Sequence, residues 1–223
     1  MKILAFDTST KFLTIACLEN RAVKAEFHKN VGIRHNELLI PAIEKMLKKI
    51  KWNIKEIELI CVGLGPGSFT GLRIAVATVK AIAMVVSCKI AGVVTMDAIV
   101  KNFPKTKGYI APFLDARKQK IYTAIYDYSQ GTPKRVTDYL LTDAREFLEK
   151  IGFEILFVGD AVEPYKEILS QYTLAKYNKN TDWYPRAVEI ARVGYEKALS
   201  GQTDDPETLE PLYLHAKECN IRI

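Results

Sequence analysis

A mixed α/β fold built from two similar halves is predicted by three features of the sequence. The first is an order of three strands, helix, strand and helix that occurs at the N-terminus and again from residue 108. The second is an aspartate, Asp7 or Asp115, just past the first strand of each copy. The third is a glycine-rich segment, 63–71, between a buried strand and a long helix. Together they indicate a mixed sheet with flanking helices in each half.

The first copy of this order has strands of apolar or alternating sequence, which favours half-buried extended structure. In its first helix, Leu39, Ile43 and Leu47 recur at helical spacing on one face. The expected strands are 2–6, 12–18, 22–28 and 59–62, and the expected helices are 36–50 and 72–86.

The second copy begins after a polar stretch with proline and glycine, 102–108, which is typical of a boundary. The halves are therefore predicted at 1–104 and 105–223, with a terminal segment able to pack back on the first half. The expected strands are 109–114, 120–126, 135–141 and 155–159, and the expected helices are 143–151 and 163–171.

This duplicated layout resembles the actin-like ATPase fold of sugar kinases and heat-shock chaperones. That resemblance implies a phosphate-binding cleft faced by the aspartate after the first strand of each half. Here a vestigial nucleotide cleft would include Asp7, Thr8, Ser9 and Asp115. An alternative remains open, in which each aspartate accepts hydrogen bonds from local amides in a turn.

The glycine segment lets the backbone approach another group closely, and amides at the start of the following helix can face an anion or a partner's backbone. Its residues of interest are Gly63, Gly65, Gly67, Ser68 and Gly71. No Gly-Lys-Ser/Thr ending is present, which excludes a Walker phosphate loop. Ser68 stands where the dinucleotide fingerprint requires a third glycine. A serine in such a loop is more often a helix N-cap than a nucleophile.

Composition predicts an ordinary globular protein, with 48% hydrophobic residues and a net charge of +6 from 32 basic and 26 acidic residues. Four cysteines lie far apart in the sequence, which favours a reduced, cytoplasmic protein. Cys17 and Cys61 fall in apolar runs and are expected to behave as small hydrophobes. Charges interrupt every apolar run, so no membrane contact is predicted.

No catalytic set and no metal or cofactor site is found in the sequence. A helix-borne metal site would need two histidines three or four residues apart, but Leu39 stands four residues after His35. His35 is interpreted as a packing or capping residue. His28 is interpreted as the end of an exposed strand, and His215 has no acidic or thiol neighbour suited to catalysis.

The helix predicted at 72–86 is apolar nearly all round, so it must be covered on two sides. One side carries Leu72, Val76, Val79, Ala83 and Val86. The other carries Ile74, Ala77, Thr78, Ala81 and Val85. A partner protein or a second copy of the chain is the preferred cover for that second side, and burial within the domain is the alternative. Leu38 and Ala42 are expected to contribute to the same surface.

Five segments, in order along the chain, resemble the TsaB (YeaZ) family. They are ILAFDTS (3–9), GPGSFTGLR (65–73), LDAR (114–117), YP (184–185) and PLYL (211–214). The resemblance implies a noncatalytic relative of TsaD, once labelled a glycoprotease, that binds and activates TsaD in the formation of threonylcarbamoyladenosine next to the tRNA anticodon. His215 departs from the family, whose members often have arginine there.

The resemblance further implies that TsaE joins the complex, that tRNA is met through the complex, and that the chain alone can form a homodimer. A small Mg-ATP-dependent kinase or ATPase is the alternative from another class, using Asp7, Asp115 and the glycine segment. A glycopeptide-cleaving protease would need a metal or nucleophile site that the sequence does not contain. Direct tRNA binding lacks the interleaved aromatic and basic residues that would mark it.

Overall fold

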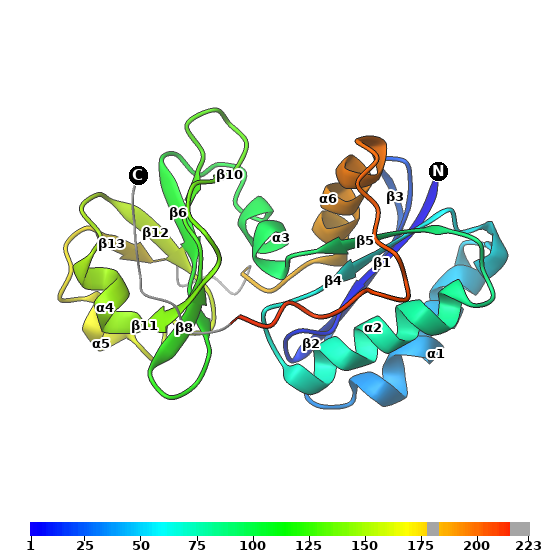
Figure 1. The fold of residues 1–223 in the computed structure, drawn as a ribbon, viewed down its shortest axis with the longest axis horizontal. Coiled ribbons are helices and arrows are strands. Elements are labelled where there is room, and N and C mark those ends of the chain that lie inside the picture. The colour runs from blue at the N-terminus through cyan, green and yellow to red at the C-terminus, as the bar shows by residue number, and fades with distance from the viewer. Residues whose placement is uncertain (178–182, 215–223) are drawn as a thin grey trace. The chain divides into compact units, whose positions relative to one another are not determined.

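The computed structural model describes residues 1–177 and 183–214 of the 223-residue chain. The chain divides into two compact units, each with its own sheet and apolar core (Figure 1). The first unit contains Met1–Ala98 and Pro185–Leu212, and the second is built mainly from Ile99–Tyr184. This division differs from the predicted halves, because Pro185–Leu212 groups with the first unit.

The sheet of the first unit has the strand order β3-β2-β1-β4-β5. β1 pairs antiparallel with β2, and β2 with β3, whereas β4 is parallel to both β1 and β5. The strands are β1 (Lys2–Asp7), β2 (Phe12–Glu19), β3 (Ala22–Asn30), β4 (Leu59–Gly63) and β5 (Lys89–Val93). The first four agree with prediction. β5 was missed because its short run contains Gly92, and glycine is depleted in strands.

Helices cover both faces of this sheet, with α1 and α2 on one side and α6 on the other (Figure 1). They are α1 (His35–Lys49), α2 (Phe69–Ala83) and α6 (Ala187–Leu199). Successive side chains of a strand point to opposite faces of the sheet, so β1 contributes to the core on each face. Leu4 and Phe6 face α1 and α2, while Ile3 and Ala5 face α6. The predicted α2 range was three residues too late, because Ser68 caps the helix ahead of Gly71.

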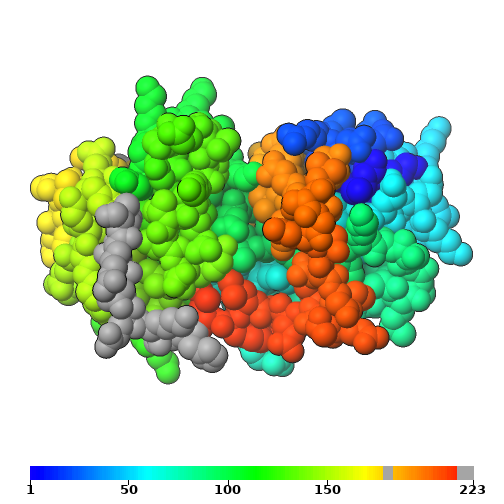
Figure 2. Space-filling model, turned by 45° about the horizontal axis from the view of Figure 1, so that its top comes forward, coloured from blue at the N-terminus to red at the C-terminus, as the bar shows by residue number. Residues whose placement is uncertain are grey.

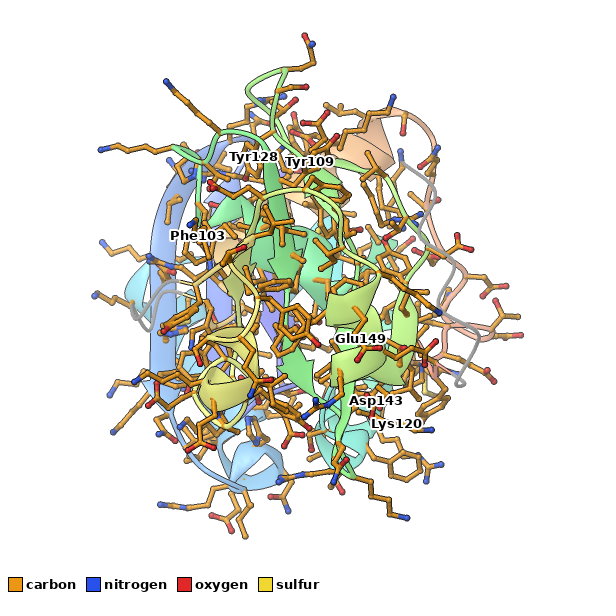
Figure 3. The ribbon with its side chains drawn as sticks, turned by 90° about the vertical axis from the view of Figure 1, so that its left-hand side faces the viewer. Phe103, Tyr109, Lys120, Tyr128, Asp143 and Glu149 are labelled. Carbon is orange, nitrogen blue, oxygen red and sulfur yellow. The ribbon has the colours of Figure 1, made fainter. Side chains whose placement is uncertain are left out.

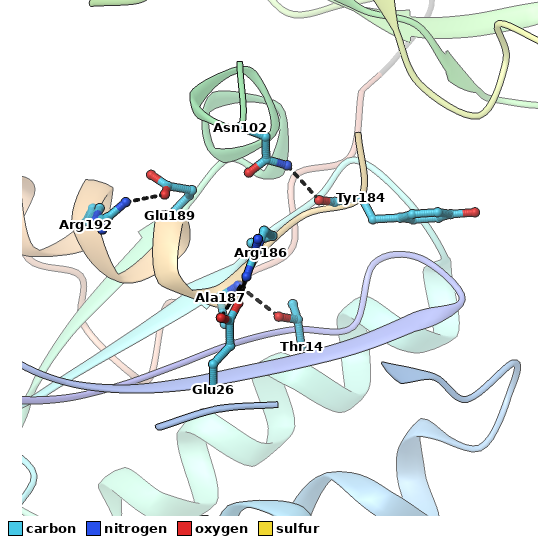
Figure 4. Close-up of polar contacts among 8 residues, drawn as sticks. All are labelled: Thr14, Glu26, Asn102, Tyr184, Arg186, Ala187, Glu189 and Arg192. Atoms are coloured by element: carbon cyan, nitrogen blue, oxygen red, sulfur yellow. Dashed lines mark hydrogen bonds and ion pairs between the residues drawn. The ribbon is translucent and has the colours of Figure 1, made fainter. Parts of the chain in front are cut away.

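Helix α6 is the longest element that sequence reasoning missed. At its start, the Arg186 guanidinium makes an ion pair with Glu26 of β3 at 2.8 Å, and the Ala187 amide donates to the Thr14 hydroxyl of β2 at 2.9 Å (Figure 4). Gly194 lies so near β4 that an added Cβ would stand 2.4 Å from the Cys61 sulfur. Small residues therefore hold α6 close to the sheet face opposite α2.

After α6 the chain crosses the surface of the first unit as a segment without helix or strand, 204–212, which contains a turn at 206–208 (Figure 2). The Asp204 amide donates to the Ile90 carbonyl, and the Gly92 amide donates to the Asp204 carboxylate. The Leu212 amide donates to the Leu64 carbonyl. These bonds attach the segment to β5 and to the start of the glycine segment.

The second unit repeats the sheet of the first. Its strand order is β10-β9-β6-β12-β13, with two antiparallel pairs on one side of β6 and two parallel pairs on the other. These strands are β6 (Tyr109–Pro112), β9 (Tyr126–Asp127), β10 (Lys134–Arg135), β12 (Ile155–Val158) and β13 (Ala175–Tyr177). The predicted duplication of a mixed sheet is confirmed.

Each of the first three predicted strands in this half is divided in two, which is a correction. The pieces outside the main sheet form a small sheet of β7 (Leu114–Asp115), β8 (Lys120–Thr123) and β11 (Leu140–Asp143). Between β8 and β9, the Ile125 amide donates to the Thr137 hydroxyl at 2.9 Å. A side-chain hydroxyl thus takes the place of a backbone carbonyl from a neighbouring strand. The periodicity of the sequence does not predict such an interruption of a strand.

Short helices complete the second unit. α4 (Ala144–Glu149) is capped by Asp143, whose carboxylate accepts from the Arg145 and Glu146 amides. Figure 3 shows Asp143 beside Lys120, its register partner in β8. α5 (Lys166–Leu169) is shorter than predicted, and α3 (Thr95–Lys101) contains the boundary between units. Phe113, Phe147 and Phe157 form the aromatic centre of the core.

Candidate functional site

The glycine segment packs against the end of β1 and the turn after it. A Cβ added to Gly63 would stand 1.8 Å from Asp7 Oδ2, and one added to Gly71 would stand 2.0 Å from the Thr8 carbonyl oxygen. A Cβ on Gly67 would meet the Ser9 carbonyl oxygen at 2.4 Å. The close approach that the glycines predicted therefore occurs, and the approached groups belong to this chain: the Asp7 side chain and the backbone of Thr8 and Ser9.

Hydrogen bonds hold the two segments together. The Thr8 hydroxyl donates to the Gly71 carbonyl at 2.7 Å, and the Ser68 amide donates to the Ser9 carbonyl at 2.7 Å. The Ser68 hydroxyl accepts from the Gly71 amide at 3.2 Å. Ser68 is thus the N-cap of α2, as predicted. Gly65 supplies the left-handed turn ahead of it, with φ of +94°.

Asp7 is buried, and both of its carboxylate oxygens have partners. Oδ1 accepts from the Ser9 amide at 2.7 Å and the Ser9 hydroxyl at 2.6 Å. Oδ2 accepts from the Thr95 hydroxyl at 2.7 Å, and that hydroxyl in turn accepts from the Gly65 amide. Burial raises the pKa of Asp7, and the bonds from Ser9 and Thr95 oppose the rise.

Asp7 is expected to make the stability of the fold fall as the pH rises. Because the pKa of Asp7 is raised from 3.8, the folded chain keeps its proton to higher pH than the unfolded chain. The free energy of unfolding, relative to that of Asp7→Asn, should therefore decline from near pH 3.8 through the raised pKa and be level above it. Urea titrations of both proteins across this range test the expectation, and a difference that does not change with pH contradicts it.

Asp115 forms the equivalent turn in the second unit. Its carboxylate accepts from the Arg117 amide at 2.8 Å, just as Asp7 accepts from the amide two residues on. The Asp115 amide donates to Asp160 at 2.8 Å, and burial raises the pKa of the Asp160 carboxyl. The alternative in which each aspartate binds local amides is therefore present at both positions. A role in a nucleotide cleft stays a prediction.

His35 is packed in the first unit, as predicted. Its side chain is buried and Nε2 lies 3.3 Å from the Phe12 carbonyl oxygen. Cys17 and Cys61 are also buried, and burial raises the pKa of the Cys17 thiol to about 12. Within 1–177 and 183–214, no three His, Cys, Asp or Glu side chains are grouped as metal ligands. His215 and Cys219 lie outside the described residues.

The second side of α2 is exposed to solvent for most of its length. Ala77, Ala81 and Val85 are exposed and Ile74 is partly buried, whereas Leu72, Val76 and Val79 are buried in the core. Exposed Phe69 and Met84 stand at its two ends, with Met84 87% exposed. We call Phe69, Ile74, Ala77, Ala81, Met84 and Val85 the α2 outer face. Thr78 was expected here but is buried at 9% exposure, so it belongs to the core side.

Leu38 and Ala42 were expected to join the same surface, and the structure places them elsewhere. Both line a groove between α1 and β3, on the side of α1 where β3 lies. Ile40, about 200° further round the helix from Leu38, is 51% exposed. Nothing in the helical pattern distinguished these directions, because the position of β3 beside α1 decides which residues line the groove.

Two sheets of the same order, one per unit, and an aspartate turn after the first strand of each define a duplicated α/β protein of the actin-like ATPase class. ROK hexokinase from Thermus thermophilus shares this fold, with a TM-score of 0.50 and 10% identity over 90% of this chain and all of that one. YeaZ from Pseudomonas aeruginosa is closer, at a TM-score of 0.81 and 22% identity over 96% of this chain and 99% of that one.

Sequence comparison narrows the class. The family model described as TsaD, tRNA N6-adenosine threonylcarbamoyltransferase, matches residues 19–222. The "tRNA threonylcarbamoyladenosine biosynthesis protein TsaB" of Bacillus subtilis (strain 168) is 30% identical over 233 aligned residues, which cover 100% of this chain and 97% of the relative. The chain therefore belongs to the TsaB (YeaZ) family, as the sequence resemblance indicated. No helix in the described part of the chain is long and apolar enough to span a membrane.

Proposed function

We propose that this chain is a noncatalytic subunit that supports formation of threonylcarbamoyladenosine next to the anticodon in tRNAs reading codons that start with A. It acts by binding and activating a TsaD-type transferase. The names of its TsaB relatives place those proteins in this biosynthesis. The observation that carries the proposal for this chain is the α2 outer face, which is apolar and exposed.

The chemistry of that face suits a partner helix. Ala77 and Ala81 have small side chains, and the distance between packed helices falls when the contact residues are small. A partner helix could therefore approach the α2 backbone closely. Phe69, Met84 and Val85 add apolar area at the two ends. Contiguous exposed apolar residues are typical of protein interaction sites. The same face is proposed to pair with a second copy of the chain when the transferase is absent.

A noncatalytic role is supported by how the glycine segment is used. The carboxylate of Asp7 accepts from Ser9 and Thr95, and the space beside Gly63, Gly67 and Gly71 is filled by the chain itself. For the same reason a Mg-ATP-dependent kinase or ATPase is not favoured. In the proposal TsaE joins the chain and the transferase in the cytoplasm, and tRNA is met through that complex.

Reconstitution with unmodified tRNA and threonylcarbamoyl-adenylate tests the proposal. The chain alone should produce no threonylcarbamoyladenosine, whereas the mixture of TsaD, TsaE and this chain should produce it. Omitting the chain should lower the initial rate of product formation by about a hundredfold or more, which corresponds to about 2.7 kcal/mol of activation free energy. Nucleoside analysis by mass spectrometry measures the product.

Two outcomes would contradict the proposal. Equal yield with and without the chain would remove its role in activation. Product made by the chain without TsaD would make it an enzyme in its own right.

A further inference from the structure

A groove of about 570 Å³ runs between β3 and α1 in the first unit, and the proposed function makes no use of it. Its volume falls in the range of specific binding pockets. The α1 side extends from Arg34 to Lys49, about 22 Å at the rise of an α-helix. The groove is therefore long enough to take a segment of a partner protein.

The floor of the groove is apolar. Three apolar residues face the helix side of the sheet and pack beside Leu38 and Ala42. They are Ala25 and Phe27 in β3, and Val31 just after it. All five are only partly buried. The intervening β3 residues point to the other face, where Glu26 binds Arg186. An apolar side chain that entered the groove would therefore remove this apolar surface from contact with water.

The rim of the groove is basic. Lys29 stands on β3, Lys45 and Lys49 stand on α1, and all three side chains are exposed. None of the three has an acidic partner among residues 1–177 and 183–214. Glu26 is the one acidic residue that lines the groove, but its carboxylate is turned to the other face of the sheet and pairs with Arg186. The rim therefore offers positive charge to an incoming group.

The position of the groove favours a helix as its occupant. α1 and α2 form one layer on this face of the sheet, and β3 is the edge strand on the far side of the groove from α1. The space beside α1 under β3 is where a further helix of the same layer would pack. A strand added to the β3 edge would instead lie in the plane of the sheet and leave the groove floor exposed.

We propose that the β3–α1 groove binds an acidic amphipathic helix of a partner protein. Apolar side chains spaced three or four residues apart enter between Phe27 and Ala42, and flanking carboxylates face Lys29, Lys45 and Lys49. Nucleic acid is less suited, because phosphates would meet the lysines but would leave the apolar floor uncovered. A second copy of this chain would bring its own basic α1 toward a basic rim.

Selection from a display library of random 16-residue peptides tests the proposal, with the full-length chain as bait. Recovered peptides should be enriched in Asp and Glu around apolar residues at helical spacing. Their affinities for the native chain and for Lys45→Glu/Lys49→Glu are then compared by fluorescence anisotropy. The double variant should bind about tenfold more weakly or worse, since it reverses two facing charges. Lys55→Glu/Lys89→Glu makes the same charge change at exposed positions away from the groove and should bind as the native chain does.

Two further variants separate charge from fit. Ala42→Trp fills the floor and should abolish binding while the rim lysines remain. Peptides with every Asp and Glu changed to Lys should bind Lys45→Glu/Lys49→Glu better than they bind the native chain. If Ala42→Trp fails to fold, the lysine variants alone decide.

Each contrary outcome overturns the proposal. Recovered peptides without acidic enrichment, or with equal affinity for the native chain and Lys45→Glu/Lys49→Glu, exclude an acidic helix. Binding of a single-stranded RNA oligonucleotide that the same double variant abolishes, with no peptide binding, would make the groove a nucleic-acid site. Self-association lost in Lys45→Glu/Lys49→Glu would make a second copy the occupant.

Discussion

Ala81→Glu is expected to abolish binding to a TsaD-type transferase while leaving this chain folded. Ala81 is exposed at the middle of the α2 outer face, so the new carboxylate lies in water in the free chain. In the complex it would be buried without a partner, which costs several kcal/mol. The dissociation constant should therefore rise about a hundredfold or more, and calorimetric titration with the purified transferase measures it.

A matched control separates this effect from a general change of charge. Gln202→Glu adds the same charge at an exposed position after α6 and should bind as the native chain does. The thermal midpoint of Ala81→Glu should stay close to the native value, because surface substitutions usually change stability by within about 0.5 kcal/mol. If Ala81→Glu bound normally, the interface would lie elsewhere. If it unfolded, the α2 outer face would be internal.

Gly71→Ala is expected to lower the free energy of unfolding by about 3 kcal/mol. Helix propensity alone favours alanine over glycine by about 1 kcal/mol. Against this, the new Cβ would stand 2.0 Å from the Thr8 carbonyl oxygen, a backbone atom that no rotamer change can move. The Thr8 hydroxyl also donates to the Gly71 carbonyl at 2.7 Å, so the two segments cannot separate without losing that bond. The steric term should decide the sign.

Gly152→Ala supplies the control for this substitution. No heavy atom beyond its two chain neighbours lies within 4 Å of the Cβ it would add, so the conformational entropy of the unfolded chain is the main change. Gly152→Ala should be neutral or slightly stabilising, by up to about 1 kcal/mol. Urea denaturation of the three proteins measures both values. Gly71→Ala as stable as the native chain would mean that the glycine segment is not held by Thr8.

Local patterns in the sequence were enough for the elements that repeat. Alternating and apolar runs located β1, β2, β3 and β4, and helical spacing of Leu39, Ile43 and Leu47 located α1, because these signals arise within one segment. The sequence also predicted that α2 has apolar residues on two sides, and Ala77 and Ala81 on its outer side are exposed.

Contacts between segments that lie far apart in the chain could not be predicted from the sequence. Thr95 lies 88 residues from Asp7, and no pattern marks its hydroxyl as the partner of that carboxylate. The burial of Thr78 and the place of Leu38 in the β3–α1 groove depend on which neighbours pack beside α2 and α1. Helix α6 was missed although its small residues fit closely against β4, because a small residue says nothing about what it approaches.

The sequence by itself determined that two mixed α/β halves would form, that a glycine segment would approach some group closely, and that α2 would have two apolar sides. The tertiary structure alone decided that the glycines face Asp7, Thr8 and Ser9, that α6 returns from the C-terminal half of the sequence to cover the far face of the first sheet, and that one side of α2 stays exposed. The physical reason is one of range. Propensity and periodicity act over a few residues, whereas burial depends on segments that the chain brings together from far apart.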